Sequence, residues 1–335
     1  MDVAASTLDG NDKKNSPKKV RDPDRSQLLA AISEAYYIEG LDQTEIAERF
    51  GFNRSAISRH LTEARDAGIV EIKVHREFSL NDRLGAELSA KSLGTNVHVI
   101  NASSLGTVAL NDIVARYTSR LLYERFNKKS VLAITLGTMV LAVARALSVL
   151  PPTNIEIVQM CGSVGNTGIN VDSHAIVQLL STAYRTEGTY LHAPFLVENR
   201  TMLEALLRNP GNLASVNKCK TATIALVGLG TLDTETSSLA RGGHVSQEIM
   251  ATLKRMGAVG DVGGYVIDRE GTPMSDPDYV PVIAVSNSEF RQVPMRVGSA
   301  VGQHKAEIIA AALRSGILTE LITDSATANT VATMI

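Results

Sequence analysis

Polar side chains that could read the edges of DNA bases are concentrated in residues 41–61, LDQTEIAERFGFNRSAISRHL. A helix-turn-helix needs a small residue where its two helices cross, and Ala47 meets this requirement. Four positions later the turn needs a residue that tolerates positive φ, and Gly51 does so. Apolar residues stand where the helices must lock together: Ile46, Phe50, Phe52, Ile57 and Leu61. The segment therefore predicts a helix-turn-helix, with a plain three-helix bundle as the alternative.

The second helix of such a unit enters the major groove by its N-terminal end. The predicted DNA contacts are Gln43, Thr44, Arg54, Ser55, Ser58 and Arg59. Arg54 and Ser55 are the best placed for base edges, because arginine can form two hydrogen bonds with guanine. Gln43 and Thr44 begin the preceding helix, whose N-terminus favours a bound phosphate. Ser58 and Arg59 could reach bases or phosphates. For each residue taken alone, a solvated helix face is the alternative.

Glycines follow several of the short apolar runs in the rest of the chain. Gly137 and Thr138 follow VLAIT and open a helix, so backbone N–H groups, the threonine hydroxyl and the positive end of the helix could bind an anion together. Lys305 begins another helix that could point at the same anion. For a single glycine the alternative is a tight turn, and for the lysine a solvated position.

Periodicity indicates the elements that would hold these residues. Residues 1–24 predict a mobile tail, residues 25–75 a helical DNA-binding domain ending in a strand at 69–74, and residues 76–335 a second, larger domain. The strands expected in this last domain are 97–100, 131–135, 155–160, 221–228, 282–286 and 318–323. Because amphipathic helices alternate with them, we expect an α/β fold with a doubly wound, mostly parallel sheet. Such sheets bind ligands at the carboxyl ends of their strands.

Composition limits the remaining possibilities. The chain has 335 residues, 44% of them hydrophobic and 20% charged, which predicts folded domains rather than disorder. Cys161 and Cys219 are far apart and are expected to be buried thiols, with neither a disulfide nor a metal site. The sequence has no leader peptide pattern and no apolar run of 18 residues. It therefore predicts a cytoplasmic protein with no membrane partner.

The net charge of the chain does not favour DNA binding. The whole chain has a formal charge of −2, and residues 51–76 hold five basic and three acidic side chains. A single helix-turn-helix is therefore expected to bind DNA weakly. Useful affinity implies a homo-oligomer that places two or more copies on a palindromic or repeated operator.

A series of motifs in a fixed order carries a family resemblance. The first is YYIEGLDQTEIAERFGFNRSAISRHLTEARDAGIVEIKV (36–74), and the later ones are LGTM (136–139), CGSVGN (161–166), HAPF (192–195), LVGLG (226–230), GAVGDVGGYVIDREG (257–271), IAVS (283–286) and HKAEIIAAALRSGILTELITDSATA (304–328). Together they resemble the SorC family of bacterial transcription regulators, which bind sugars through a DeoR-type effector domain. The resemblance implies an effector domain similar to ribose-5-phosphate isomerase and glucosamine-6-phosphate deaminase without their activity, and a tetramer or dimer of dimers.

The resemblance also implies roles for individual residues. The implied effector contacts are Gly137, Thr138, Gly162, Ser163, Gly228, Gly230, Asp261 and Lys305. Gly137 and Thr138 would fall in the loop that holds a ligand phosphate. Gly162 and Ser163 would line a second loop, and Gly228 and Gly230 a third. Asp261 would meet sugar hydroxyls and Lys305 would supply a cationic contact. The chain departs from the family pattern at Met139, where a second threonine is common, and at 287–288, where a glycine pair is common.

The sequence thus predicts a repressor that responds to a sugar or sugar phosphate and needs no cofactor. One alternative is an isomerase-like or deaminase-like enzyme, which would need an acid or base beside the sugar. Asp172, His174 and His192 are the candidates for that role, but they form no compact cluster in the sequence-predicted loops. The other alternative is a constitutive DNA-binding protein that uses its large domain only for assembly.

Overall fold

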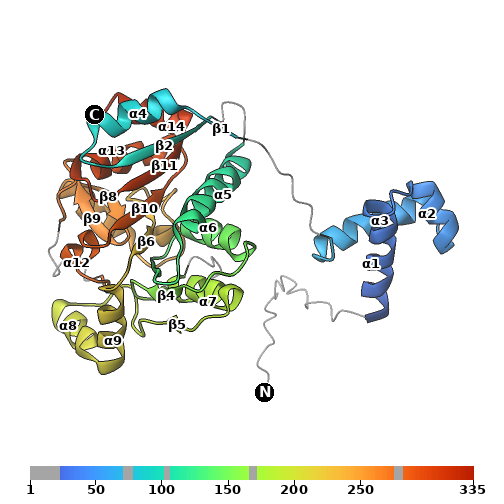
Figure 1. Ribbon diagram of the computed structural model, residues 1–335, viewed down its shortest axis with the longest axis horizontal. Helices are drawn as coiled ribbons and strands as arrows, with labels where there is room; N and C mark the ends of the chain where they lie inside the picture. The colour runs from blue at the N-terminus through green and yellow to red at the C-terminus, as the bar shows by residue number, and fades with distance from the viewer. Residues whose placement is uncertain (1–22, 71–77, 102–105, 166–171, 275–281) are drawn as a thin grey trace, which may run out of the picture. The chain divides into compact units, whose positions relative to one another are not determined.

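The computed structural model describes residues 23–70, 78–101, 106–165, 172–274 and 282–335. The chain forms two compact units, residues 1–75 and 76–335. Figure 1 shows the helical first unit in blue and the larger α/β unit in cyan to red. The expected tail, residues 1–24, lies almost wholly outside the described residues.

The first unit packs three helices around a small apolar core. The helices are α1 (Pro23–Tyr37), α2 (Gln43–Phe50) and α3 (Arg54–Asp66). Their fully or nearly fully buried apolar side chains are Ile32, Ala35, Ile46, Ala47, Ile57 and Leu61. Asp42 caps α2 by accepting the amides of Thr44 and Glu45, and the Glu45 carboxylate accepts the Asp42 amide in return. This reciprocal cap satisfies donors that the first helical turn leaves without partners.

The connection between α2 and α3 has the geometry that the sequence predicts. Gly51 ends α2 at φ 70°, in the left-handed region that favours glycine. Asn53 then caps α3, with its side-chain oxygen 2.8 Å from the Ala56 amide nitrogen. The expectation for Phe52 was wrong, because its side chain is 38% exposed and lies outside the core that locks the helices together.

The second unit is built on an eight-stranded sheet. In spatial order its strands are β1 (Ser79–Leu80), β2 (Asn96–Asn101), β11 (Glu320–Asp324), β10 (Met295–Ser299), β6 (Ile224–Val227), β3 (Val131–Ile134), β4 (Glu156–Gln159) and β5 (Gly188–Thr189). Every neighbouring pair is parallel except β1 with β2. The predicted α/β class with a mostly parallel sheet is confirmed.

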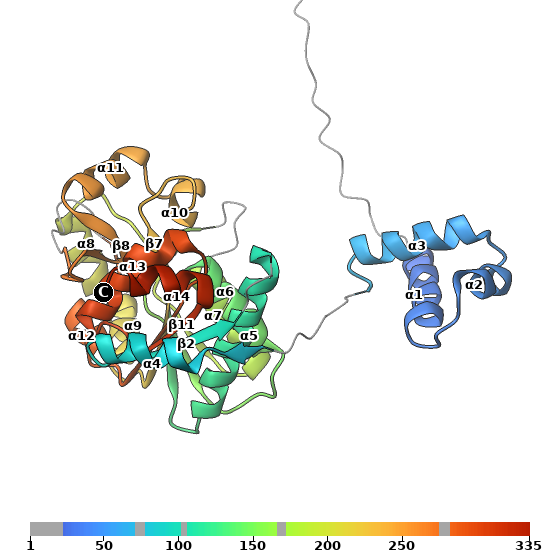
Figure 2. The ribbon, with the colours of Figure 1, turned by 90° about the horizontal axis from the view of Figure 1, so that it is seen from above.

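Helices cover both faces of this sheet, as a parallel sheet with two buried faces requires. On one face lie α5 (Thr107–Arg125), α6 (Thr138–Ser148) and α7 (Ser173–Tyr184). On the other lie α4 (Asp82–Lys91), α13 (Ala306–Ser315) and α14 (Ser325–Ala332). Figure 2 shows the two groups on opposite sides of the strands.

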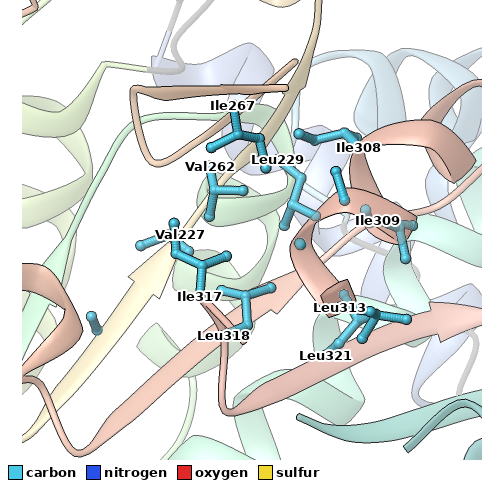
Figure 3. Close-up of a cluster of buried hydrophobic side chains, with 14 of the residues drawn as sticks. Val227, Leu229, Val262, Ile267, Ile308, Ile309, Leu313, Ile317, Leu318 and Leu321 are labelled. Atoms are coloured by element: carbon cyan, nitrogen blue, oxygen red, sulfur yellow. The ribbon is translucent and has the colours of Figure 1, made fainter. Parts of the chain in front are cut away.

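A small antiparallel sheet continues the core beyond the main sheet. It has the order β7 (Leu229–Thr231), β8 (Ala258–Val262) and β9 (Tyr265–Asp268). Val262 and Ile267 pack with Leu229 and with Ile308 of α13, so that one apolar cluster joins both sheets (Figure 3). The other helical segments are α8 (Arg200–Arg208), α9 (Pro210–Cys219), α10 (Ser238–Arg241), α11 (Gln247–Arg255), α12 (Asn287–Arg291) and the 3₁₀ helix η1 (Gln303–Lys305).

The predicted strands differ from the structure at three places. Residues 282–286 do not form a strand of the sheet, because Val282 and Ala284 make only isolated antiparallel bridges and Ser286 already caps α12. Conversely, β10 in the middle of the sheet was missed, because Arg296 and Gly298 interrupt its apolar run. Of the strand expected at 69–74, residues 71–74 lie outside the described residues, and residues 69–70 are not in a strand.

Both cysteines are buried free thiols, as predicted. Burial raises the pKa of each thiol to about 12. None of the described helices is both long enough and apolar enough to cross a membrane.

Candidate functional site

The first candidate site is the outer face of α3. Arg54, Ser55, Ser58 and Arg59 are all exposed and, at this spacing, share one side of the helix. The Ser55 hydroxyl donates to the Asn53 side-chain oxygen at 2.7 Å, so the N-terminal cap also orients this serine. The four predicted contacts therefore form one polar surface, which we call the DNA-binding face.

Two further residues lie close to this face in the sequence. His60 is buried, at 8% exposure, and its ring packs edge-on against Phe52 with centroids 5.0 Å apart. It is therefore a core residue of the helix-turn-helix rather than an outward neighbour of Arg59. Thr44 is exposed at the start of α2, and both its amide and its side chain hydrogen-bond to Asp42.

Ion pairs hold the DNA-binding unit in shape. The Arg25 guanidinium lies 2.6 Å from the Glu63 carboxylate and joins the start of α1 to α3. Arg49 of α2 pairs with Glu39 in the loop before it. Because these pairs are partly exposed, each contributes little stability.

The second candidate site lies at the carboxyl ends of β3, β4 and β6. Here the backbones of Gly137 and Gly228 come together, and a β-carbon on Gly137 would be 3.6 Å from the Gly228 Cα. The Gly228 amide donates to the Thr135 hydroxyl at 3.1 Å, and a β-carbon on Gly228 would be only 2.8 Å from the Leu136 carbonyl oxygen. Glycine is needed here because the two loops touch through their backbones.

Thr138 begins α6 next to this contact and is exposed. Gly137, the N-cap residue, has φ 142°, and no side chain of the described residues caps the helix. The first amides of α6 therefore remain available to an anion, together with the positive end of the helix dipole.

The second loop, Gly162 and Ser163 after β4, is held by a residue that the sequence did not assign to it. Asp172 accepts the Ser163 hydroxyl at 2.8 Å and the Val164 amide at 2.9 Å. A β-carbon on Gly162 would overlap the Pro194 carbonyl, so this loop packs tightly on residues 193–195. Asp172 was considered only as a catalytic candidate, and its place directly before α7 is a sequence signal for a helix cap, whereas its carboxylate binds the loop instead.

The third loop brings Gly230, Asp261 and Lys305 together. Gly230 lies directly opposite Asp261 in the β7–β8 pair. Burial raises the pKa of the Asp261 carboxyl, and the Gly264 amide, 2.9 Å from Asp261 Oδ2, and the Lys305 charge oppose this rise. Burial lowers the pKa of Lys305, whose Nζ donates to the Leu229 carbonyl at 2.7 Å. Asp261 and Lys305 therefore act on each other's charge in a largely buried place.

Lys305 ends the 3₁₀ helix η1, and the residue that precedes this helix fixes its start. Gly302 has φ 100°, and its amide donates to the Asp324 carboxylate at 3.1 Å and to the Thr327 hydroxyl at 2.9 Å. The start of η1 is therefore tied to the end of β11.

Arg241 and His244 are further polar residues that sequence reasoning missed. The charge of Arg241 lowers the pKa of Lys305, and the charge of Asp172 raises that of His244 against the lowering effect of burial. The segment that follows β7 thus brings a guanidinium group near Lys305 and an imidazole near Asp172. No periodicity marks this segment, so only the structure could place it.

We call the groups around Thr138, Ser163, Asp172, Asp261 and Lys305 the effector site. It offers amides and a hydroxyl at one end, and a carboxylate beside an ammonium group at another. Among the described residues, no group of three His, Cys, Asp or Glu side chains could hold a metal ion. His174 packs on Tyr190, with ring centroids 4.4 Å apart, rather than joining Asp172 in an acid–base pair.

Comparisons with known proteins find matches for both units of the chain. Residues 76–333 match the family described as "Putative sugar-binding domain", and residues 22–71 match "Bacterial regulatory protein, arsR family". The chain is 27% identical over 307 residues to the Deoxyribonucleoside regulator of Bacillus subtilis (strain 168), covering 92% of this chain and 97% of that protein. It is 28% identical over 311 residues to the Transcriptional regulator LsrR of Enterobacter sp. (strain 638), covering 91% and 92%.

A solved structure has the same fold. The full-length sorbitol operon regulator SorC from Klebsiella pneumoniae superposes with a TM-score of 0.67 and 19% identity, covering 92% of this chain and 99% of that one. Relatives that match over nearly their whole length are transcriptional regulators, which argues against an enzyme. The resemblance inferred from the motifs is confirmed. The chain belongs to the SorC family of transcriptional regulators, in which a helix-turn-helix is joined to a sugar-binding domain.

Proposed function

We propose that this regulator represses a carbohydrate-metabolism operon in the cytoplasm and that a sugar phosphate bound at the effector site relieves the repression. The observation that carries the choice of ligand is the separation of charge within that site. Thr138 and the uncapped start of α6 favour a phosphate. Asp261, opposite Gly230 on the small sheet, favours hydroxyl groups.

The sugar would lie between these ends. Lys305 keeps Asp261 partly neutralised, so the carboxylate can accept hydrogen bonds from sugar hydroxyls without strongly repelling the phosphate. Gly162, Gly228 and Gly230 keep side chains out of the space beside the ligand. Asp172 holds the Ser163 loop in place. This assignment requires neither a cofactor nor a catalytic step.

The DNA-binding face would read the operator. Arg54 and Ser55 contact base edges, Ser58 and Arg59 contact bases or phosphates, and the start of α2 at Gln43 and Thr44 meets a phosphate. The helix caps at Asp42 and Asn53 fix these side chains before DNA is bound. A homo-oligomer, a tetramer or dimer of dimers, would supply the second helix-turn-helix that a palindromic operator needs.

Effector and operator would be linked through the assembly. A ligand shifts an equilibrium only by its difference in affinity for the two states. A coupling free energy of about 1–3 kcal/mol would change operator affinity by roughly 5- to 150-fold.

A thermal-shift screen of the full chain against sugars, sugar phosphates and polyols tests the proposal. A ligand that binds only the folded protein raises its melting temperature. We expect a shift with a phosphorylated sugar, and the same compound should weaken operator binding in a fluorescence-anisotropy assay. A shift with unphosphorylated compounds alone would overturn the phosphate assignment. Tighter operator binding would overturn the sign of regulation, and no shift with any compound would favour constitutive DNA binding.

A further inference from the structure

A second surface feature lies on the other side of the turn that carries Asp261. It is an apolar groove of about 480 Å³, whose walls include Leu203, Leu207, Leu213, Val216, Tyr265 and Val282. The groove runs between the α8–α9 helix pair and the segment that leads into α12 (Figure 1). It is outside the effector site, because Thr138, Ser163, Asp261 and Lys305 do not line it.

Helix α8 has an apolar side that the described residues leave incompletely buried. Met202, Leu203, Leu206 and Leu207 fall on one side of the helix, yet none of the residues of α8 is buried. Met202 is 42% exposed and Leu213 of α9 is 45% exposed. The adjoining side of α8 carries Arg200, Glu204 and Arg208 in a chain of i,i+4 ion pairs, and Arg208 lies where this side meets the groove. A helix with this pattern indicates that something else covers its apolar side.

The two rims of the groove carry opposite charges. Arg208 stands on the α8 rim, and Glu289 stands on the α12 rim, where it pairs with Lys220 at 3.1 Å. In a two-fold interface the same patch serves both subunits, so each residue of one rim meets the facing rim of the other copy. Arg208 of one copy would then meet Glu289 of the other, and the apolar sides of the two α8 helices would cover each other's grooves.

We propose that this groove is a two-fold association surface for a second copy of the chain. The inference rests on the homo-oligomer part of the proposed function and gives that oligomer a location. The complementary rims and the uncovered leucines of α8 favour a copy of the same surface over a small ligand, because the groove is apolar along its length and charged only at its edges.

The surface shares a wall with the effector site. Gly264 and Tyr265 line the groove, and the Gly264 amide donates to Asp261 at the effector site. Tyr265 is fixed between the two by its hydroxyl, which donates to the Val285 carbonyl at 2.5 Å, and by stacking on Phe290 with centroids 5.4 Å apart. A ligand that moves Asp261 therefore has a short path to the partner copy.

Sedimentation velocity of the full chain at micromolar concentration tests the proposal. Leu213→Glu places a charge in the groove at a site that is already 45% exposed, so the fold should tolerate it. We expect the dissociation constant for self-association of the Leu213→Glu variant to be at least tenfold higher than that of the wild type. Met256→Glu is the matched control, because Met256 is 41% exposed and does not line the groove. Arg208→Glu should weaken association at least threefold, whereas Arg255→Glu on α11 should not.

The outcomes separate this inference from the proposed function. If the wild type associates and Leu213→Glu retains the same mass, or if Met256→Glu loses association equally, the groove is not the interface. If Arg208→Glu associates like the wild type, the two-fold arrangement is wrong. If the wild type is monomeric at all concentrations tested, the homo-oligomer part of the proposed function fails together with the groove, while the effector screen still tests the rest.

Discussion

Gly230 and Asp261 lie so close across the β7–β8 pair that a β-carbon on Gly230 would overlap the Asp261 carboxylate. The glycine thus determines where the carboxylate can lie. Gly230 is not among the glycines with positive φ, so an alanine at this position changes space rather than backbone preference.

Gly230→Ala should therefore displace Asp261 and weaken effector binding at least tenfold, with operator binding retained in the absence of effector. Isothermal titration with the sugar phosphate found in the screen measures the first effect, and anisotropy with operator DNA measures the second. Gly106→Ala is the control, because a β-carbon there meets nothing within 4 Å. Wild-type effector affinity in Gly230→Ala would remove Asp261 from the site.

Thr138→Ala should abolish or strongly reduce the response to a phosphorylated ligand. The hydroxyl is lost from the start of α6, where we place the phosphate, while the helix itself should persist. The chain offers a close control in Thr107→Ala, because α5 also begins with a glycine N-cap followed by an exposed threonine and has no side-chain cap. If the two variants respond alike to the ligand, the phosphate is not at α6.

Arg54→Ala should weaken specific operator binding by about 1–3 kcal/mol if the guanidinium reads a base. Substitution of the operator base pair that Arg54 reads should then reduce the operator affinity of the variant less than that of the wild type. Arg65→Ala, in the last turn of the same helix, is the control. Unchanged operator affinity of Arg54→Ala would remove this residue from the DNA-binding face.

His60 should make the DNA-binding unit less stable in acid. Burial lowers the pKa of His60 below its usual value near 6.5, and its Nδ1 is buried without a hydrogen-bond partner among the described residues. The unfolded chain therefore takes up this proton more readily than the folded chain. The stabilising effect of neutral His60 is present above pH 6.5 and is lost as the pH falls through the folded pKa.

Urea unfolding at pH 7.5 and pH 5.5, followed by circular dichroism, measures this effect. The loss of stability between the two pH values should be smaller in His60→Leu than in the wild type. Arg25, Arg59 and Glu63 all act on the pKa of this ring, and they are retained in the variant. An equal pH dependence in the two proteins would assign the acid sensitivity to other groups.

The sequence predicted those parts of the fold that depend on local rules. The left-handed residue at Gly51, the cap at Asn53 and the apolar positions of the first unit follow from spacing within 20 residues. The parallel sheet followed from the alternation of apolar runs and helices. Strand β10 could not be predicted in this way, because its two non-apolar residues are accommodated by tertiary contacts. A β-carbon on Gly298 would be too close to the side chains of Leu229 and Leu318, and the Arg296 guanidinium donates to the carbonyls of Val293 and Ile317.

The effector site, too, has parts that local sequence patterns predict and parts that depend on residues distant in the sequence. Glycines at strand ends and the threonine after them are visible as local patterns, and the structure brings Gly137 and Gly228 into contact. Asp172, Arg241 and His244 reach the site through loops whose course depends on tertiary packing. Their roles become visible only when those loops are placed beside Ser163 and Lys305.

The two buried cysteines make the protein convenient for site-specific labelling. With pKa values raised to about 12, Cys161 and Cys219 hold very little thiolate near neutral pH and should react slowly with maleimides. An exposed cysteine introduced by Thr62→Cys in the first unit and another by Lys254→Cys in the second would then carry a fluorophore pair without removal of the native thiols. Energy transfer between them would follow the separation of the two units directly as operator and sugar are added.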